Sequence, residues 1–162
     1  MDKVFEPSKK PNHHTPFRPT RFTDGQRAVF YSALEDETSI DEMRYHQRRV
    51  GELADLEANP SAAPRHFWLY EADFGGRVLD LFEQHPSCPE LTSEDEDGYP
   101  KCRQLAAEAR SKKINAFRTP SARRSEGTCT PVFDRASLGH APRMKAHGRF
   151  VHVNGDVVFR RD

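Results

Sequence analysis

The order of apolar and polar residues predicts a mixture of strands and helices. The run RAVFYSA (27–33) follows a turn signal and is rich in aromatic and β-branched residues, so a strand is expected there. A helix is expected from about Ser39 to about Glu57, because apolar residues recur at roughly helical spacing and Thr38 stands three residues before Asp41, a weak form of the capping box. The aromatic run HFWLYEADF (66–74) predicts a second strand, which ends at a glycine pair.

The second half of the chain continues this mixed pattern. Residues 78–82 fit either a short strand or a helical turn, and the local pattern does not decide between them. A helix is expected over Tyr99–Lys113, and short strands are expected at INAFRT (114–119) and TCTPVF (128–133). Asn154-Gly155, between RFVHV and DVVFRR, is the clearest hairpin signal because it suits a type I′ turn. Without a regular βαβ rhythm, the pattern favours an α+β fold with a mixed sheet core.

Composition narrows the class of protein. The 162 residues predict a single domain, 1–162, with an irregular arm over residues 1–16. Because 25 basic residues balance 25 acidic ones, no overall charge favours nucleic acid or an anionic membrane. No stretch is apolar enough to cross a bilayer or to act as a signal segment. We therefore expect a cytoplasmic protein that binds neither membranes nor, directly, nucleic acid.

Cysteine and histidine spacing gives no sign of a metal centre. The three cysteines form an odd set without a CxxC pair, which is typical of free thiols in a reducing compartment. His13 and His14 are adjacent on an irregular stretch, whereas a metal site needs three or four converging ligands. No metal is expected.

No single segment carries a strong catalytic motif, since the chain has no P-loop, HExxH or GxSxG. Four segments in order nevertheless form a pattern: TPFRPTRF (15–22), VFYSALEDETSIDEMRYH (29–46), INAFRTPSARR (114–124) and GTCTPVFD (127–134). Together they resemble the RES domain, a family named for an Arg, a Glu and a Ser. The similarity runs from about Thr15 to about Leu138.

The resemblance implies a fold similar to bacterial ADP-ribosyltransferases and an activity on NAD+ by hydrolysis, phosphorolysis or transfer of ADP-ribose. It also implies a toxin that a cognate antitoxin protein holds silent. The leading interpretation is therefore a toxin enzyme that cleaves the nicotinamide–ribose bond and depletes NAD+.

The resemblance also assigns roles to residues. Glu42 matches the family's glutamate, and a carboxylate there would stabilise the positive charge that develops on the ribose. Arg18 and Arg21 match the two arginines, whose guanidinium forks suit a pyrophosphate. Ser121 matches the serine, with the expected task of orienting Glu42 or the ribose rather than acting as a nucleophile. From the residues alone, a helix-dipole role for Glu42 and surface ion pairs for the arginines stay open.

Three further positions are expected to contact the dinucleotide. Tyr31 matches a strand tyrosine that stacks on nicotinamide or donates from its hydroxyl, and Arg123 lies near the phosphates. Cys129 stands where many relatives carry Asn, and a thiol replaces an amide poorly as a donor and acceptor. Pro19, after the first arginine, is a second departure from the family pattern.

Two other functions remain open on the sequence. A mono-ADP-ribosyltransferase would use the same site with a protein as acceptor. A non-catalytic module would contact nucleic acid through the arginine-rich stretches 44–49 and 118–124, although the neutral net charge and the lack of a recognition-helix motif count against it.

Overall fold

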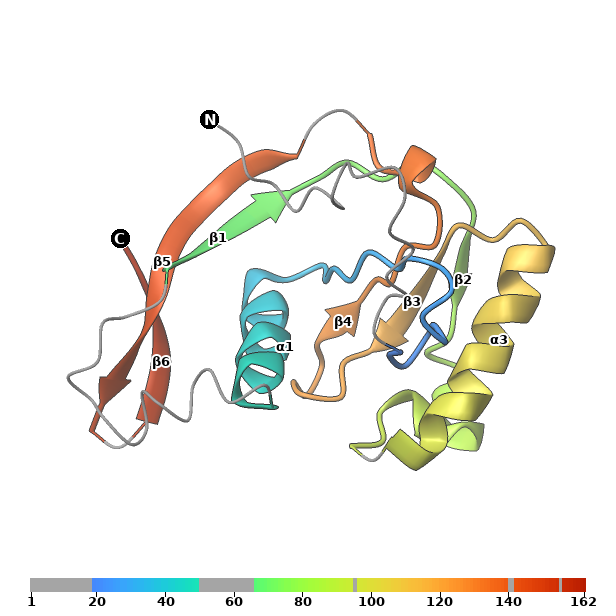
Figure 1. The fold of residues 1–162 in the computed structure, drawn as a ribbon, viewed down its shortest axis with the longest axis horizontal. Coiled ribbons are helices and arrows are strands. Elements are labelled where there is room, and N and C mark those ends of the chain that lie inside the picture. Colours follow the sequence, from blue (N-terminus) through green and yellow to red (C-terminus); the bar gives the residue numbers. More distant parts are fainter. Residues whose placement is uncertain (1–18, 50–65, 95, 140–141, 155) are drawn as a thin grey trace.

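In the computed structural model of this chain, two small sheets lie on either side of a helix (Figure 1). The structure describes residues 19–49, 66–94, 96–139, 142–154 and 156–162. The expected α+β class with mixed strand pairing is confirmed. Three expectations fall outside the described residues: the arm over residues 1–16, the position of Arg18 and the end of the first predicted helix.

One sheet consists of three antiparallel strands in the order β1-β5-β6, with β1 at His66–Glu71, β5 at Arg143–Val153 and β6 at Asp156–Arg161. β5 and β6 form the hairpin that the sequence predicts, with Val153 paired to Asp156 across a two-residue turn. Asn154 has a φ of 52°, the left-handed conformation that a type I′ turn requires. The Asn154-Gly155 turn therefore determines the position of the β5–β6 hairpin without help from distant parts of the chain.

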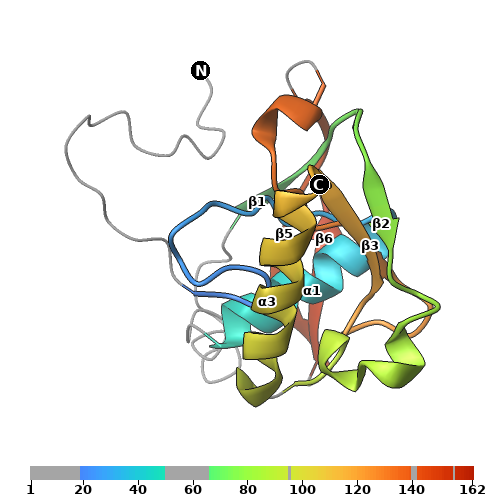
Figure 2. The same ribbon diagram turned by 90° about the vertical axis from the view of Figure 1, so that its right-hand side faces the viewer.

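The other sheet has the order β2-β3-β4, with β2 at Val78–Asp80, β3 at Ala116–Pro120 and β4 at Thr128–Cys129. β2 and β3 are parallel, and the chain between them includes helix α3 (Tyr99–Ser111), which lies at the front of the fold in Figure 2. Short 3-10 helices lie at His85–Ser87, Pro89–Leu91, Glu96–Gly98 and Arg135–Ser137. The undecided stretch 78–82 is thus a strand followed by a turn.

Each sheet has its own apolar cluster. Between α3 and the β2-β3-β4 sheet, Phe22, Leu81, Ala106 and Phe117 are almost completely buried. Helix α1 (Asp36–Arg49) contributes Ile40 to the second cluster, where Phe150 of the β1-β5-β6 sheet is fully buried. In Figure 1, α1 lies between the β1-β5-β6 sheet and β4. This position brings α1 against the β3–β4 connection.

Three predicted elements differ from the structure. The prediction of a continuous strand over 27–33 was wrong. The segment forms isolated bridges and a few backbone hydrogen bonds to residues 129–132, and the Ser32 hydroxyl donates to the Thr130 carbonyl at 2.7 Å. β4 is shorter than the predicted 128–133, because Pro131 has no N–H to donate to β3. α1 begins at Asp36 rather than Ser39, so Thr38 lies inside the first turn instead of capping it.

The predicted strand over 66–74 and the predicted helix over Tyr99–Lys113 are confirmed, with small changes in their bounds. The predicted strand over 66–74 is a regular strand only as far as Glu71, and Phe74 then forms an isolated bridge to Leu138. The predicted helix over Tyr99–Lys113 ends at Ser111. Two residues later Lys113 has a positive φ of 58°, which a helix cannot contain. Within the described ranges, no helix is both long and apolar enough to cross a membrane.

Candidate functional site

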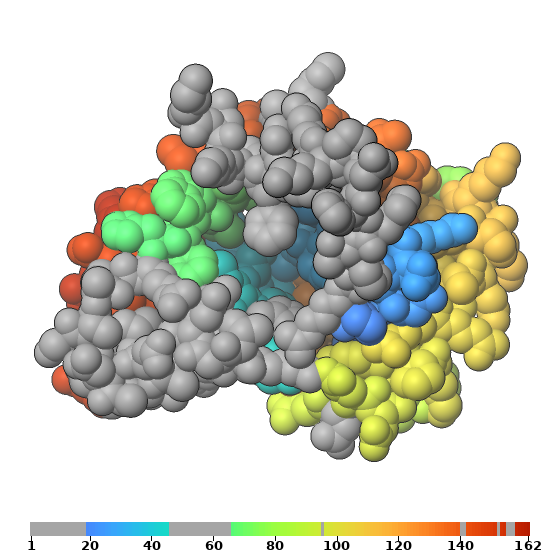
Figure 3. All heavy atoms as spheres, viewed as in Figure 1, coloured from blue at the N-terminus to red at the C-terminus, as the bar shows by residue number. Residues whose placement is uncertain are grey.

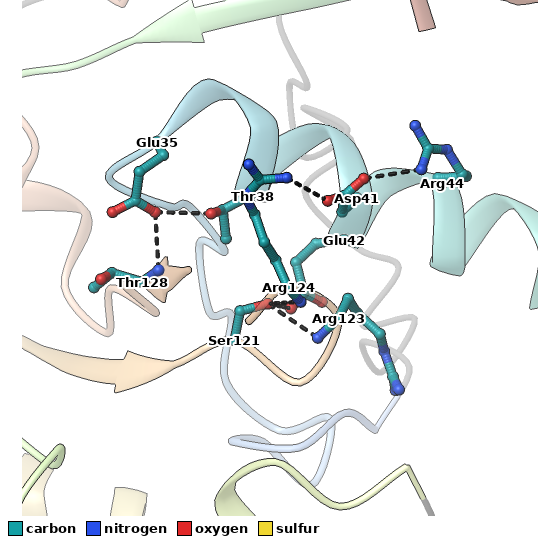
Figure 4. A network of polar contacts seen from close by, with 9 residues as sticks. All are labelled: Glu35, Thr38, Asp41, Glu42, Arg44, Ser121, Arg123, Arg124 and Thr128. Atoms are coloured by element: carbon teal, nitrogen blue, oxygen red, sulfur yellow. Dashed lines mark hydrogen bonds and ion pairs between the residues drawn. The ribbon is translucent and has the colours of Figure 1, made fainter. Parts of the chain in front are cut away.

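The start of α1 is tied to the β3–β4 connection by a set of polar contacts (Figure 4). Glu35, the residue before the helix, accepts hydrogen bonds from the Thr38 hydroxyl at 2.7 Å and from the Thr128 N–H at 2.8 Å. Burial raises the pKa of the Glu35 carboxyl, but these two donors outweigh that effect and leave the pKa below its ordinary value. A tertiary contact therefore decides where this helix begins.

One turn further along α1, Glu42 points toward the same connection. The Ser121 hydroxyl donates to Glu42 Oε1 at 2.6 Å, and the Cys129 thiol lies 3.4 Å from the same oxygen. Ser121 Oγ in turn accepts the backbone N–H groups of Arg123 and Arg124 at 3.1 and 3.2 Å. These two N–H groups fix the hydroxyl so that its O–H bond points at the Glu42 carboxylate. Ser121 therefore orients Glu42 and does not present a free nucleophile.

Gly127 lets the loop after Ser121 approach the helix closely. The Ser121 N–H donates to the Gly127 carbonyl at 2.8 Å, which closes the loop. A Cβ at Gly127 would lie 2.6 Å from the Thr38 hydroxyl oxygen, closer than real contacts allow. Only glycine therefore lets Ser121 reach Glu42 without a shift of the loop.

Glu42 lines a cavity of about 290 Å³. The volume is near the lower end of the range of about 300–1,000 Å³ that is typical of small-molecule sites. The other lining residues come from the segment before α1, from α1 itself, from the stretch around the start of α3 and from the β3–β4 region: Pro19, Thr20, Arg21, Phe22, Tyr31, Tyr45, Leu91, Glu96, Tyr99, Thr119, Pro120, Ala122, Arg123, Cys129 and Pro131. In the space-filling view, part of α1 and of the chain leading into it is seen in a hollow beside β1, whereas the beginning of that segment lies at the front (Figure 3).

Arg21 lines this cavity, but its guanidinium is already engaged. Nη1 donates to the Glu90 carbonyl at 2.6 Å and Nη2 to the Ser93 carbonyl at 2.7 Å. The group also lies over the Tyr99 ring, 4.8 Å from its centroid. The fork that the resemblance assigns to pyrophosphate thus holds the backbone of the 90–93 loop.

The hydroxyl of Tyr31 is engaged within the chain, although the residue is partly exposed. Tyr31 is 44% exposed, and its hydroxyl hydrogen-bonds to Thr20 Oγ1 at 2.5 Å and accepts the Phe22 N–H at 3.2 Å. Burial raises the pKa of this phenol against the opposing effect of these hydrogen bonds. The hydroxyl positions the 20–22 segment, and the ring stacks on Phe22 with 6.4 Å between the centroids, while part of the residue stays exposed.

Arg123 is the buried cation of the cavity. Its side chain is 7% exposed, and its guanidinium lies 3.3 Å from the centroid of the Tyr45 ring. Nη1 lies 3.2 Å from a carboxylate oxygen of the exposed Glu94, yet neither Nη1 nor Nε makes a hydrogen bond with any described residue. In Figure 4 the side chain extends away from Ser121. A buried guanidinium with unused donors suits an anionic ligand.

Cys129 is a thiol rather than a thiolate. Burial and the charge of Glu42 raise its pKa to about 12, so the sulfur keeps its proton at neutral pH. It can therefore offer Glu42 a weak S–H donor, where an amide would offer a stronger N–H.

The structure brings most of the predicted site residues together. Glu42, Arg21, Tyr31, Arg123 and Cys129 line one cavity, and Ser121 supports it from behind through Glu42. Two cavity aromatics, Tyr45 and Tyr99, were missed. Tyr45 was recoverable, because it follows Glu42 by three residues on a helix and so shares its face. No local signal marks Tyr99.

Comparison with known proteins agrees with the pattern of segments. The family model of the RES domain matches residues 3–152 of the 162-residue chain. The matched range includes all four segments on which the resemblance rests, so the resemblance is confirmed. No curated protein sequence matches the chain.

Proposed function

The chain belongs to the RES-domain family, and we propose that it is an enzyme that cleaves the bond between nicotinamide and ribose in NAD+. The observation that carries the proposal is the placement of Glu42. Its carboxylate is fixed by the Ser121 hydroxyl at the wall of a cavity that also contains the buried, incompletely bonded Arg123. A fixed negative charge and a buried positive one match a substrate with a cationic and an anionic part.

The chemistry requires a negative charge beside the ribose. When the bond from C1′ to the nicotinamide nitrogen breaks, its electron pair leaves with nicotinamide and the sugar gains oxocarbenium character. A carboxylate that is already oriented stabilises this charge without reorganising during the reaction. Water then adds to C1′ and loses a proton, giving ADP-ribose, nicotinamide and one proton. In this scheme Glu42 faces the ribose and Ser121 is a positioning residue.

The remaining cavity residues divide between substrate contacts and support. Arg123 contacts the pyrophosphate, because its side chain lines the cavity and its planar group is supported by Tyr45. Tyr31, which is partly exposed, stacks on nicotinamide. Arg21 acts mainly on the protein side by holding the 90–93 loop that contributes Leu91 to the wall. Arg18 remains a predicted phosphate contact outside the described residues.

The arrangement of the arginines argues against a nucleic-acid-binding module. Arg44 and Arg124 both pair with Asp41, Arg118 pairs with Asp80, and Arg123 is buried. Arg44, Arg118 and Arg124 thus each have an acidic partner, and the side chain of Arg123 is withdrawn from the surface. Phosphate binding needs exposed, unpaired cations, so no basic patch of that kind arises from them.

Incubation of the purified chain with NAD+ and chromatographic identification of the products tests the proposal. Free nicotinamide together with ADP-ribose supports hydrolysis, and ADP-ribose carrying an extra phosphate supports phosphorolysis. Label from adenine-labelled NAD+ that stays on a protein indicates the alternative, a mono-ADP-ribosyltransferase. The proposal is refuted if NAD+ persists in buffer alone, in the presence of inorganic phosphate and in the presence of candidate acceptor proteins.

A toxin role makes a separate demand in cells. Expression of the chain alone is expected to lower NAD+ and arrest growth, and co-expression of its cognate antitoxin is expected to restore both. Growth without loss of NAD+, at a verified level of active protein, contradicts the toxin role.

A further inference from the structure

A second cluster of reactive side chains lies on the β1-β5-β6 sheet. His66 of β1, His147 of β5 and Asp162, the residue after β6, each offer one ligand atom, and these atoms all lie within 4.8 Å of one another. His66 Nδ1 is 3.0 Å from His147 Nε2 and 3.8 Å from Asp162 Oδ2. His147 Nδ1 is 3.0 Å from the same carboxylate oxygen.

Strand pairing places these three residues on one face. Trp68 pairs directly with His147, so His66, two residues earlier on β1, shares its face. The Asp162 N–H donates to the His147 carbonyl at 3.1 Å, which extends the ladder by one residue. Phe150 and Phe159 pack toward α1 from positions of opposite parity. The cluster therefore lies on the face of the sheet that points away from α1 and from the NAD+ cavity proposed above.

From this geometry we propose that His66, His147 and Asp162 form a binding site for a divalent metal ion of the zinc class. Zn²⁺ binds imidazole nitrogen and carboxylate oxygen at about 2.0–2.2 Å, so ligand atoms in a tetrahedral site lie roughly 3.3 Å apart. The separations of His66 Nδ1 from His147 Nε2 (3.0 Å) and from Asp162 Oδ2 (3.8 Å) bracket that value, and one ligand atom of each residue lies within 4.8 Å of those of the other two. Three protein ligands leave the fourth position for water.

The surroundings of the cluster hold its ligands in place. The Trp68 ring stacks on His147 with 5.1 Å between centroids, which restricts rotation of the imidazole. Arg149 Nε lies 3.4 Å from Asp162 Oδ1, so the other carboxylate oxygen, Oδ2, is left to face the two histidines. Two nitrogen ligands and one oxygen favour Zn²⁺ over Mg²⁺, which prefers all-oxygen sites. The bound ion would join all three strands of the sheet.

Titration of the full chain, purified without a histidine tag, with ZnCl₂ in a calorimeter tests this site. The parent is expected to bind one Zn²⁺ ion that MgCl₂ does not displace. His66→Gln and Asp162→Asn should each weaken that binding by about tenfold or more. His85→Gln is the matched control, because His85 lies outside the sheet and bonds Thr92. Its affinity for Zn²⁺ should equal that of the parent.

Thermal unfolding provides the second measurement. Zn²⁺ should raise the unfolding midpoint of the parent and of His85→Gln, and should have little effect on His66→Gln. A parent that binds no Zn²⁺ overturns the proposal, as do cluster variants that bind it as tightly as the parent. Glu42→Gln should bind Zn²⁺ normally, so failure of the proposed NAD+ chemistry and failure of this metal site are distinguishable.

Discussion

Replacing Glu42 by Gln tests the charge at the centre of the candidate site. Gln keeps the shape of the side chain and an oxygen that can accept the Ser121 hydroxyl, which lies 2.6 Å from Glu42 Oε1. The change therefore removes the negative charge and little else. Losing one pre-organised electrostatic contact to a transition state costs about 3–4 kcal/mol, or two to three powers of ten in rate. We expect NAD+ consumption to fall by that factor.

The assay follows the disappearance of NAD+ for the parent and the variant at equal protein concentration. Glu37→Gln is the matched control, because Glu37 is an exposed residue in the first turn of the same helix and its change removes the same charge. Glu37→Gln should leave the rate of NAD+ consumption within about twofold of the parent's rate, since a helix-dipole effect is worth under about 1 kcal/mol of stability. A Glu42→Gln protein that unfolds like the parent and still consumes NAD+ at a similar rate would refute the assignment.

Four further predictions follow from the same contacts. Arg123→Lys should raise the KM for NAD+ roughly tenfold or more, because an ammonium group cannot replace a planar fork on Tyr45; an unchanged KM removes Arg123 from the site. Gly127→Ala should lower the rate of NAD+ loss, since its Cβ would lie 2.6 Å from the Thr38 hydroxyl oxygen; parental activity contradicts this. Cys129, with a pKa of about 12, should react with iodoacetamide at pH 8 about fiftyfold more slowly in the folded than in the unfolded chain, as peptide mass spectrometry can measure. Asp36→Asn should cost about 1 kcal/mol at neutral pH, a shift of about 2–4 °C in the unfolding midpoint.

The Asp36 prediction has a definite pH dependence. Hydrogen bonds from Lys145 and Arg161 lower the pKa of Asp36 in the folded chain, with the Lys145 contact having the largest effect and burial opposing both. The stability that a carboxylate with a lowered pKa contributes is present above its ordinary pKa and is lost as the pH falls through the folded value. The difference between parent and Asp36→Asn should therefore be largest near pH 7 and vanish at low pH. A difference that grows on acidification contradicts this linkage.

Elements with strong local signals were predictable from the sequence. The β5–β6 hairpin follows from Asn154-Gly155, and α3 follows from its apolar face, because turn chemistry and helical periodicity act over a few residues. The start of α1 was not predictable in this way. It depends on the Thr128 N–H, which reaches Glu35 from 93 residues further along the chain.

The candidate site shows the same division. Four separated segments predicted that Glu42 and Ser121 would meet, and the structure places them in direct contact. Their pattern could not reveal that the two terminal nitrogens of Arg21 are taken by the carbonyls of Glu90 and Ser93, since backbone acceptors carry no sequence signature. Arg123 shows the converse, because only the fold reveals that its side chain is buried on Tyr45.

The position of α1 between the two sheets explains how the charge of Glu42 is held in place. On one side Asp36 bonds to β5 and β6, and on the other Glu35 and Asp41 bond to the β3–β4 connection. The contact of Asp41 with Arg124 is half exposed on the arginine side, so it is worth at most about 1 kcal/mol. Glu35 accepts one part-buried hydrogen bond from Thr38 of α1 itself and one from the Thr128 N–H of β4, and a bond to a charged group is worth about 1.5–3 kcal/mol. The Thr128–Glu35 bond therefore holds the helix against β4 more strongly than the Asp41 contact does, and it supports the direct bond between Ser121 and Glu42.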